Sequence, residues 1–299
     1  MPVLECVPNI SEGRSAVRVA ALAGAVTSAG LALLDLHTDA DHHRSVLTFA
    51  GEPERVVAAA HAVADAAVDS IDVREHAGVH PRIGAIDVIP FVPIEGLTLA
   101  DAAGFARTFA RDFSARHGVP TFLYEAAASS PARAPLEAVR RGGLAGLAAR
   151  MSGDPLWHPD FGPATPHPTA GVTAVGARLP LIAWNVELAT DRLEIAVAIA
   201  AAIRQRSGGL PGVKALGLPL AERGIVQVSI NLVDHRQTSM REVFDRVVEM
   251  ARRLGVDVLA SELVGLAPAA ALDANVAAHI HLRGFSDAMI LERRIEARA

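Results

Sequence analysis

Histidines gather in two short segments of this 299-residue chain, and they are the side chains best suited to chemistry here. The first segment reads His37-Thr-Asp-Ala-Asp-His42-His43 and falls between two expected strands. Imidazole and carboxylate groups are ligands of first-row metals, so a metal site is one hypothesis. The alternative is a polar turn that is solvated or lines a substrate. The chain has neither the H-E-x-x-H pattern nor the EF-hand spacing that would favour a metal site, and we expect no bound metal.

The second segment reads His76-Ala-Gly-Val-His80-Pro-Arg82-Ile-Gly84-Ala-Ile-Asp87. The proline after His80 biases its backbone toward an extended conformation. Arg82 has the planar donor fork that suits a carboxylate. A histidine held beside an arginine suits general acid/base catalysis, because its pKa lies near neutrality. From spacing alone, His80 is equally well read as an ordinary loop histidine.

Residue usage excludes several classes of enzyme. Lys214 is the only lysine and is followed by Ala215, so the chain has no Walker A loop. The one cysteine, Cys6, forms no internal disulfide and no multi-cysteine zinc site, and it is typical of a reducing cytoplasm. There is also no G-x-S-x-G nucleophile elbow, G-x-G-x-x-G dinucleotide loop or C-x-x-C pair.

Composition indicates a globular protein that binds small molecules. Hydrophobic residues make up 51% and charged residues 20%, which is enough for a sizeable core. The net charge of −5 argues against a protein that coats nucleic acid or binds a membrane through basic residues. The N-terminus lacks the pattern of a signal peptide, and the uncharged stretch 19–34 is too short to span a bilayer. We therefore expect a cytoplasmic protein.

Hydrophobic periodicity predicts alternating strands and helices in both halves of the chain. In the first half, the expected strands are 4–7, 31–36, 43–49, 86–91 and 121–124, and the expected helices are 11–28, 53–71 and 99–117. In the second half, the expected strands are 181–186, 214–217, 226–232 and 256–263, with helices over 191–205 and from Ser239 to Leu254. Asp191 with Glu194 and Ser239 with Glu242 have the spacing of capping boxes.

Both halves thus follow the β-α-β-β-α-β order of a ferredoxin-like unit. The predicted fold is α/β (α+β), with two similar subdomains, 1–177 and 178–299, whose mixed sheets pack about a ligand crevice. Between the halves, 154–176 contains Trp157, Phe161 and five prolines. This composition predicts an ordered loop between domains rather than a flexible linker. Crevices between domains are favoured sites for small molecules.

Several motifs in colinear order resemble glutamate formimidoyltransferase, the transferase portion of formimidoyltransferase-cyclodeaminase. They are Glu5-Cys-Val-Pro-Asn-Ile-Ser-Glu-Gly-Arg14, Leu33-Leu-Asp-Leu-His37 with His43-Arg-Ser-Val46, the His76 to Asp87 segment through Pro90-Phe-x-Pro93, Asp160-Phe-Gly-Pro163, Gly176-Ala-Arg178 and Ser261-Glu-Leu-Val-Gly-Leu266. The His-Pro-Arg segment is the most specific of them. The resemblance covers nearly the whole chain and is to the transferase portion alone, so we expect transfer and no cyclodeaminase activity.

The resemblance implies transfer of a formimidoyl group from N-formimidoyl-L-glutamate to N5 of tetrahydrofolate, a co-substrate, late in histidine breakdown. The family's acid/base histidine falls on His80. Its folate-contacting segment falls on Gly162, Pro163, Ala164, Thr165, Pro166, His167, Pro168, Thr169, Ala170 and Gly171. The animal enzymes place aspartate where this chain has His37.

Both implied substrates carry carboxylates, so arginines are candidate clamps. The substrate-binding candidates are His37, Arg44, Arg82 and Arg178, with Arg14 as a further arginine; each arginine is also readable as a surface ion pair. Two other functions stay open: a metal-dependent hydrolase of a formimidoyl or formyl amino acid that uses the His37–His43 segment, and a non-catalytic folate-binding module. The expected partners are small molecules, without nucleic acid or membrane; a homodimer is allowed.

Overall fold

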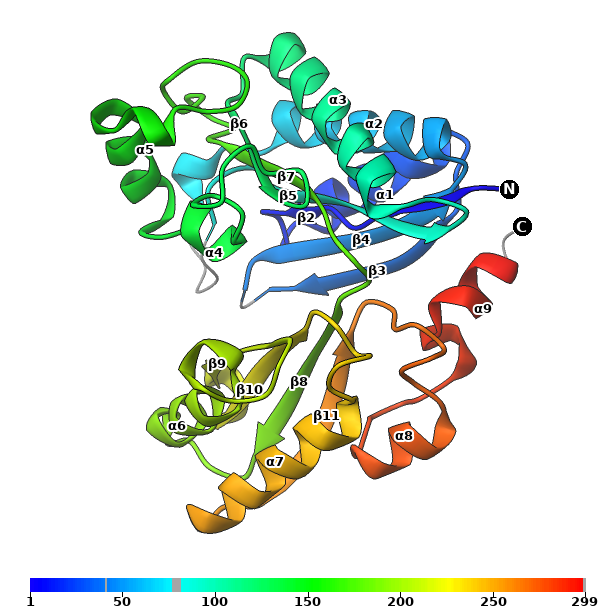
Figure 1. Ribbon diagram of the computed structural model, residues 1–299, viewed down its shortest axis with the longest axis vertical. Helices are drawn as coiled ribbons and strands as arrows, with labels where there is room; N and C mark the ends of the chain where they lie inside the picture. Colours follow the sequence, from blue (N-terminus) through cyan, green and yellow to red (C-terminus); the bar gives the residue numbers. More distant parts are fainter. Residues whose placement is uncertain (41, 77–81, 298–299) are drawn as a thin grey trace. The chain divides into compact units, whose positions relative to one another are not determined.

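The computed structural model describes residues 1–40, 42–76 and 82–297. The chain divides into two compact units, Met1–Arg178 and Leu179–Ala299, and each has its own β-sheet (Figure 1). Each unit also has its own hydrophobic core. The expected α/β fold with two subdomains is confirmed. Among the described residues, no helix is long and apolar enough to cross a bilayer.

The N-terminal sheet is built around four strands in the ferredoxin-like order β5-β1-β4-β3. These strands are β1 (Val3–Cys6), β3 (Leu33–Asp39), β4 (Arg44–Gly51) and β5 (Ile86–Glu95). The short β2 (Asn9–Ile10) follows Pro8 and pairs with both β4 and β5. On the other side of β5, β7 (Thr173–Ala177) and β6 (Thr121–Glu125) extend the sheet in parallel.

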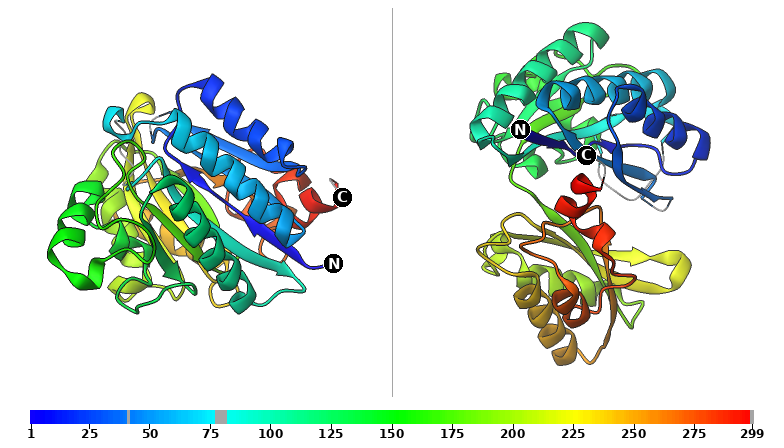
Figure 2. Two further views of the ribbon diagram at one scale, coloured as in Figure 1. Left: turned by 90° about the horizontal axis from the view of Figure 1, so that it is seen from above. Right: turned by 90° about the vertical axis from the view of Figure 1, so that its right-hand side faces the viewer.

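Helices cover this sheet on both faces. Figures 1 and 2 show α1 (Ala16–Ser28), α2 (Pro53–Ser70) and α3 (Leu99–His117) together on one face. They bury an aliphatic and phenylalanine core that includes Leu22, Phe49 and Phe109. On the opposite face, α4 (Leu136–Val139) and α5 (Gly143–Gly153) pack against β6 and β7 through a smaller cluster. The smaller cluster contains no residue of β1, β3 or β4, so it does not cover the part of this face that those strands form.

The C-terminal unit has the same element order in a simpler form. Its sheet order is β11-β8-β10-β9, and all its ladders are antiparallel. The strands are β8 (Ile182–Leu188), β9 (Val213–Leu220), β10 (Ile225–Leu232) and β11 (Val258–Val264), and the helices are α6 (Leu193–Ile203), α7 (Met240–Arg253), α8 (Ala274–His279) and α9 (Leu291–Glu296). The expectation of a mixed sheet is therefore wrong for this unit.

Three other expectations need correction. The first helix begins at Ala16 with Ser15 as its N-cap, not at Ser11, because residues 11–14 form a turn around Glu12. Asp191 forms no capping box: α6 begins after Arg192, whose side chain pairs with Glu194 instead. Ser239 does cap α7, accepting a hydrogen bond from the Glu242 N–H.

The third correction concerns segment 154–176, which does not lie between the two units. It lies within the N-terminal unit, which extends to Arg178, and its last residues belong to β7, which pairs between β5 and the edge strand β6. Strand β7 is short and contains Gly176, so its apolar pattern is weak. A Cβ at Gly176 would lie 2.5 Å from the Tyr124 ring, which explains the glycine.

Candidate functional site

Glu12 is a buried carboxylate at the start of the candidate site. It lies in the turn between β2 and α1, where its Oε1 accepts hydrogen bonds from the backbone N–H groups of Arg14 (2.8 Å) and Ser15 (2.9 Å). Arg18 pairs with Oε2 at 3.1 Å. Burial raises the pKa of Glu12, but these hydrogen bonds together with one from His43 outweigh it and lower the pKa to about 2. Glu12 is therefore a fixed negative charge at neutral pH.

Gly13 allows this turn to approach the β3–β4 hairpin closely. A Cβ at Gly13 would lie 2.3 Å from the carbonyl oxygen of Asp39 and 2.5 Å from the backbone nitrogen of Arg44. Only glycine avoids both clashes. The Ser45 hydroxyl donates to the Glu12 carbonyl at 2.6 Å and closes the same contact. The Ser-Glu-Gly-Arg motif thus positions a carboxylate against the hairpin.

The hairpin directs its two adjacent histidines to different carboxylates. His42 pairs through Nδ1 with Asp39 at 2.5 Å, whereas Nε2 of His43 lies 3.1 Å from Oε1 of Glu12. Because Glu12 is ionised, His43 is the donor. The backbone of His43 has a φ of +47°, a left-handed conformation that side-chain-bearing residues rarely adopt. Such strained residues concentrate at functional sites.

His76 and Arg82 lie against the backbone of this hairpin. Arg82 donates from Nη2 to the His42 carbonyl at 2.8 Å and from Nη1 to the His43 carbonyl at 3.1 Å. His76 donates from Nε2 to the same His43 carbonyl at 3.0 Å, and its ring centroid lies 3.8 Å from that of His43. Nδ1 of His76 lies 2.8 Å from Nη1 of Arg82 and is therefore an acceptor.

These contacts keep His76 neutral. Burial, and then the charge of Arg82, lower the pKa of His76 to about 4. A neutral imidazole accepts the Arg82 N–H bond, whereas a protonated one would repel the guanidinium. His76 thus helps to hold Arg82, the residue that follows Pro81 in the His-Pro-Arg motif.

A third carboxylate and two more arginines complete the cluster. Asp87 accepts the backbone N–H of Ile83 at 2.8 Å and forms an ion pair with Arg140, from the end of α4. Burial, and then repulsion by Arg140, lower the pKa of Arg44 to about 10. Arg82 is also repelled by Arg14 and Arg140. Several cations thus share one region with few carboxylates, which is suited to holding an anionic substrate.

The sequence-predicted residues differ in how they relate to this cluster. Arg44, Arg82 and Arg14 belong to it, and His37 lies on β3 two residues before Asp39. His80 lies outside the described residues, although His76 and Arg82 on either side of it both belong to the cluster. Arg178 follows β7 and donates its N–H to the Phe91 carbonyl at 3.2 Å. Phe91 is four residues beyond Asp87 on β5, which is ~13 Å along the strand. Arg178 is therefore not part of this cluster and stays a separate prediction.

The segment 162–171 is anchored at both ends within the N-terminal unit. At its start, a Cβ on Gly162 would lie 2.3 Å from the Ser114 hydroxyl; at its end, a Cβ on Gly171 would lie 2.5 Å from the Ile83 carbonyl oxygen. Both glycines also have positive φ. Packing and backbone conformation therefore account for both glycines.

Hydrogen bonds tie the same segment to the candidate site. The Ala170 carbonyl accepts the Ala85 N–H at 2.9 Å, and the Thr169 carbonyl accepts the Val73 N–H at 2.8 Å. Nδ1 of His167 accepts the N–H of Ala170 at 3.0 Å, so this histidine builds the turn. Residues 162–165 and 168 are exposed. The segment is thus hydrogen-bonded to Val73 and to Ala85, which lie before His76 and after Arg82 in the sequence.

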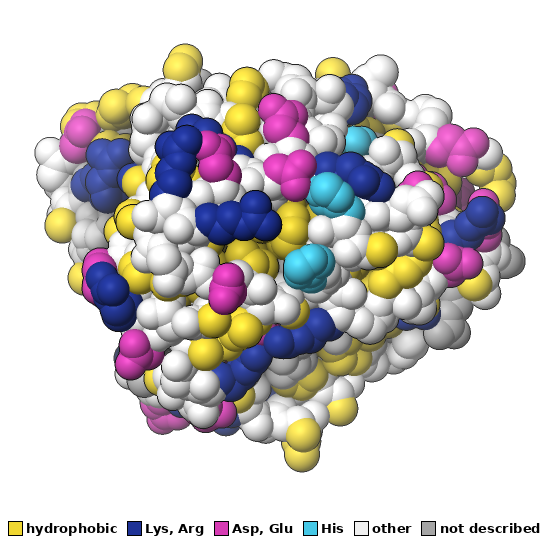
Figure 3. Space-filling model, turned by 90° about the horizontal axis from the view of Figure 1, so that it is seen from below, with side chains coloured by type: hydrophobic (Ala, Val, Ile, Leu, Met, Phe, Trp, Pro, Cys, Tyr) yellow, Lys and Arg dark blue, Asp and Glu magenta, His cyan; other side chains and the backbone are white. Residues whose placement is uncertain are grey.

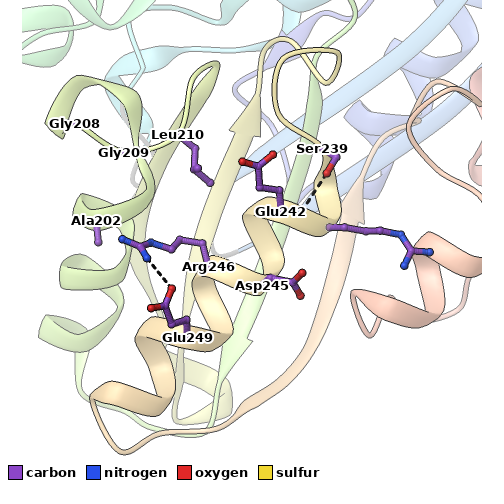
Figure 4. A pocket seen from close by; sticks show the side chains of 10 residues that line it. Ala202, Gly208, Gly209, Leu210, Ser239, Glu242, Asp245, Arg246 and Glu249 are labelled. Carbon is purple, nitrogen blue, oxygen red and sulfur yellow. Dashed lines mark hydrogen bonds and ion pairs between the residues drawn. The ribbon is translucent and has the colours of Figure 1, made fainter.

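Other features carry less chemistry. The described residues, which omit Asp41 and 77–81, contain no group of three or more metal-ligating side chains. A hollow of about 680 Å³ opens in the C-terminal unit beside α7, far along the chain from the histidine segments. In it, Arg246 pairs with Glu249 at 2.6 Å and Ser239 caps α7 (Figure 4), and Asp245 pairs with His279 at 2.7 Å, so three of its charged side chains have partners within the unit. We therefore place the candidate site at the histidine–arginine cluster.

Comparison with known proteins agrees with the motifs. The N-terminal subdomain of the formiminotransferase domain matches residues 3–178, and the formiminotransferase domain matches residues 183–294. The chain belongs to the formiminotransferase family. A glutamate formimidoyltransferase from Streptococcus pyogenes is 44% identical over 271 residues, which are 90% of each chain. One from Thermoplasma acidophilum is 40% identical over 100% of this chain and 99% of its own.

Formiminotransferase relatives also occur as parts of longer proteins. The pig formimidoyltransferase-cyclodeaminase is 39% identical over 90% of this chain but only 51% of its own length. A solved structure of a microcompartment protein from Desulfitobacterium hafniense aligns with 11% identity and a TM-score of 0.24, which is too low to support any argument. The relatives from Streptococcus pyogenes, Thermoplasma acidophilum and pig are named as formimidoyltransferases, so the metal-dependent hydrolase is not favoured.

Sequence reasoning did not select Glu12, His43, His76, Asp87 or Arg140 as site residues. Four of them lie inside the quoted family motifs, so the motifs contained the signal. Arg140 had none, because it comes from a short helix that the periodicity did not reveal.

Proposed function

We propose that the protein transfers the formimidoyl group of N-formimidoyl-L-glutamate to N5 of tetrahydrofolate, with His80 as the general acid/base. Membership of the formiminotransferase family supports the reaction class, and relatives named glutamate formimidoyltransferase over their whole length support the donor. The observation that carries the assignment is the cluster of arginines around Arg82, which is two residues after His80 in the sequence, because the donor is an anion.

The proposed chemistry needs two proton transfers and no covalent enzyme intermediate. N5 of the folate attacks the amidine carbon, which forms a C–N bond and a tetrahedral intermediate. N5 then loses a proton, and the amine nitrogen of glutamate gains one as its C–N bond breaks. A single histidine between the two nitrogens performs both transfers, which typically contributes 10²–10⁴-fold. Holding the two substrates together supplies a further large share.

The described residues suit supporting roles. Arg82 is held by two backbone carbonyls and by His76, so its guanidinium is oriented before substrate binds. Arg44 is half-buried and is repelled by Arg140 and Arg82 while Asp87 and Asp39 attract it, so a further carboxylate from a substrate would offset the repulsion. Residues 162–171 contact the folate in this proposal, and His37 and Arg178 remain proposed substrate contacts.

The setting of the reaction belongs to the same proposal: one-carbon metabolism and histidine degradation, in the cytoplasm. The free, buried thiol of Cys6 is typical of a reducing compartment. Acidic and basic side chains are mixed across the face drawn in Figure 3, which supports small-molecule partners rather than nucleic acid.

A turnover assay tests the function. Purified protein is incubated with both substrates, and 5-formimidoyltetrahydrofolate and free glutamate are quantified by chromatography. We expect equal amounts of both products, and none when either substrate is left out. Binding of tetrahydrofolate without any turnover would favour the folate-binding module instead.

A further inference from the structure

The C-terminal sheet has one apolar face and one polar face. Along β8, Ile182, Trp184, Val186 and Leu188 belong to the core beneath α6 and α7. The alternate residues Asn185 and Glu187 therefore point to the opposite face. Directly across from them on β10 are Ser229 and Gln227. A strand face that carries carboxylate, amide and hydroxyl groups is suited to polar ligands rather than to a second core.

On this polar face, Glu187 is held between two arginines. Arg223, in the β9–β10 turn, places Nη1 2.6 Å from Oε1 and Nη2 2.8 Å from Oε2. Arg283, which follows α8, places Nη1 2.8 Å from Oε1 and Nη2 2.6 Å from Oε2. The Glu187 side chain is only 1% exposed, whereas those of Arg223 and Arg283 are 45% and 50% exposed. All three residues lie in the C-terminal unit.

Two guanidinium groups face the single carboxylate of Glu187. A single bidentate arginine would satisfy a buried carboxylate. Glu262 on β11 is a second, exposed negative charge that acts on Arg223, and the Nε–H group of neither arginine has a partner among the described residues. Through these hydrogen bonds, Glu187 fixes the orientation of two guanidinium groups that come from separate segments of the chain, and in this sense it braces them. Their outer edges present donors with little rotamer entropy left to lose.

We propose that Arg223 and Arg283, braced by Glu187, bind a carboxylate of one of the two substrates. This inference rests on the proposed function for the identity of the ligand, because both proposed substrates carry glutamate carboxylates. The guanidinium fork matches a carboxylate geometrically. Phosphate shares this chemistry and is a competitor in the test. The C-terminal unit thereby contributes to substrate affinity and not to proton transfer.

Arginine side-chain NMR on the full chain tests the site directly. Arginine Nε–H resonances are assigned through Arg223→Gln and Arg283→Gln, and glutarate serves as the dicarboxylate probe. We expect both resonances to shift on titration, and inorganic phosphate to reverse the shift only at higher concentration. Arg236 is the matched control, since it pairs with Asp234 and its side chain is 64% exposed. Absence of any shift at Arg223 and Arg283 overturns the proposal.

Kinetics supply the second readout. In Arg223→Gln and in Arg283→Gln, KM for one substrate should rise about tenfold, the effect of one charge-assisted hydrogen bond, with kcat nearly unchanged. Arg223→Lys should recover part of the loss because it keeps the charge, and Arg236→Gln should leave both constants unchanged. An unchanged KM in both glutamine variants contradicts the site while leaving the proposed function intact. Resonance shifts in a wild-type protein without turnover would instead retain the site and refute the function.

Discussion

Each unit contains a buried glutamate that is reached by a side chain from a hairpin of that unit, but the two glutamates differ in position and in partners. In the N-terminal unit, Glu12 lies between the first strands and α1, and His43 of the β3–β4 hairpin reaches it. In the C-terminal unit, Glu187 lies near the end of β8, and Arg223 of the equivalent β9–β10 turn reaches it. Histidine gains and loses a proton near neutral pH, whereas arginine stays charged.

In the proposed function, this difference assigns proton transfer to the N-terminal unit and an additional carboxylate contact to the C-terminal unit. Backbone N–H groups and a histidine surround Glu12, and a strained hairpin, His76 and Arg82 lie around them. Arg18 also pairs with Glu12, whereas the ion-pair partners of Glu187 among the described residues are guanidinium groups alone. We therefore expect changes at Glu12 and at the proposed proton carrier His80 to act on kcat, and changes in the C-terminal cluster to act on KM, whereas Arg44 and Arg82 are candidates for substrate binding in the N-terminal unit.

The strongest way to break this division is to remove the proposed proton carrier. His80→Ala should lower kcat at least about a hundredfold, the usual range for loss of general acid/base catalysis, while tetrahydrofolate binding and the melting temperature persist. His158→Ala is the control, because His158 is exposed and its side chain has no described partner. Near-normal kcat in His80→Ala would contradict the assignment.

The two glutamates provide a direct comparison. Glu12→Gln keeps the shape but removes the charge that holds Arg14, Ser15, Arg18 and His43, so kcat should fall about tenfold and unfolding free energy by about 1–3 kcal/mol. Glu187→Gln should instead raise KM, with kcat within about twofold. Steady-state kinetics and chemical denaturation of both variants measure this. Equal effects of both changes on kcat would remove the distinction between the units.

The pH dependence of stability tests the environment of His76. Its pKa is about 4 in the folded protein, below its ordinary value in the unfolded chain. Between these values the unfolded state binds a proton that the folded state does not, so the free energy of unfolding decreases as pH falls from about 6.5 to 4. The slope from this one group is at most about 1.4 kcal/mol per pH unit.

His76→Asn should remove that contribution. Urea denaturation of wild type and variant across this pH range should show a shallower decline in the variant. His235→Asn in the C-terminal unit is the comparison histidine. A wild-type slope retained in His76→Asn would show that another group titrates.

The smallest expected effect concerns the proposed folate segment. Thr165→Ala removes an exposed hydroxyl, so tetrahydrofolate binding should weaken a few-fold with no change in melting temperature. His167→Ala should lower the melting temperature as well, since Nδ1 of His167 accepts the Ala170 N–H. Calorimetric titration and thermal unfolding separate the two. Unchanged affinity in Thr165→Ala would leave the segment as a structural loop.

Local pattern predicted most of the fold because each strand and helix buries one regular face. The helix Leu99–His117 was predicted to the residue, since Thr98 and Gly118 mark its ends chemically. Strand β7 was missed because Gly176 and small neighbours give little periodicity. Helices α4 and α5 were missed for a similar reason, since few of their residues are buried.

The candidate site was predictable only in part. Motifs identified the segments that contain His76, Arg82 and Arg44, because chemistry there constrains residue types. Which side chains meet depends on tertiary contacts, such as the close approach of Gly13 to Arg44. The Arg140–Asp87 pair spans 53 residues of chain, and no local pattern encodes it.

One measurement tests the central claim most directly: the fate of the formimidoyl carbon. N-formimidoyl-L-glutamate labelled with ¹³C at that carbon is mixed with the protein, with and without tetrahydrofolate, and followed by ¹³C NMR. We predict that the label moves to N5 of tetrahydrofolate as glutamate is released in equal amount, and stays on the donor when the folate is absent. Label that appears as formate or formylglutamate without folate would show hydrolysis and contradict the proposed transfer.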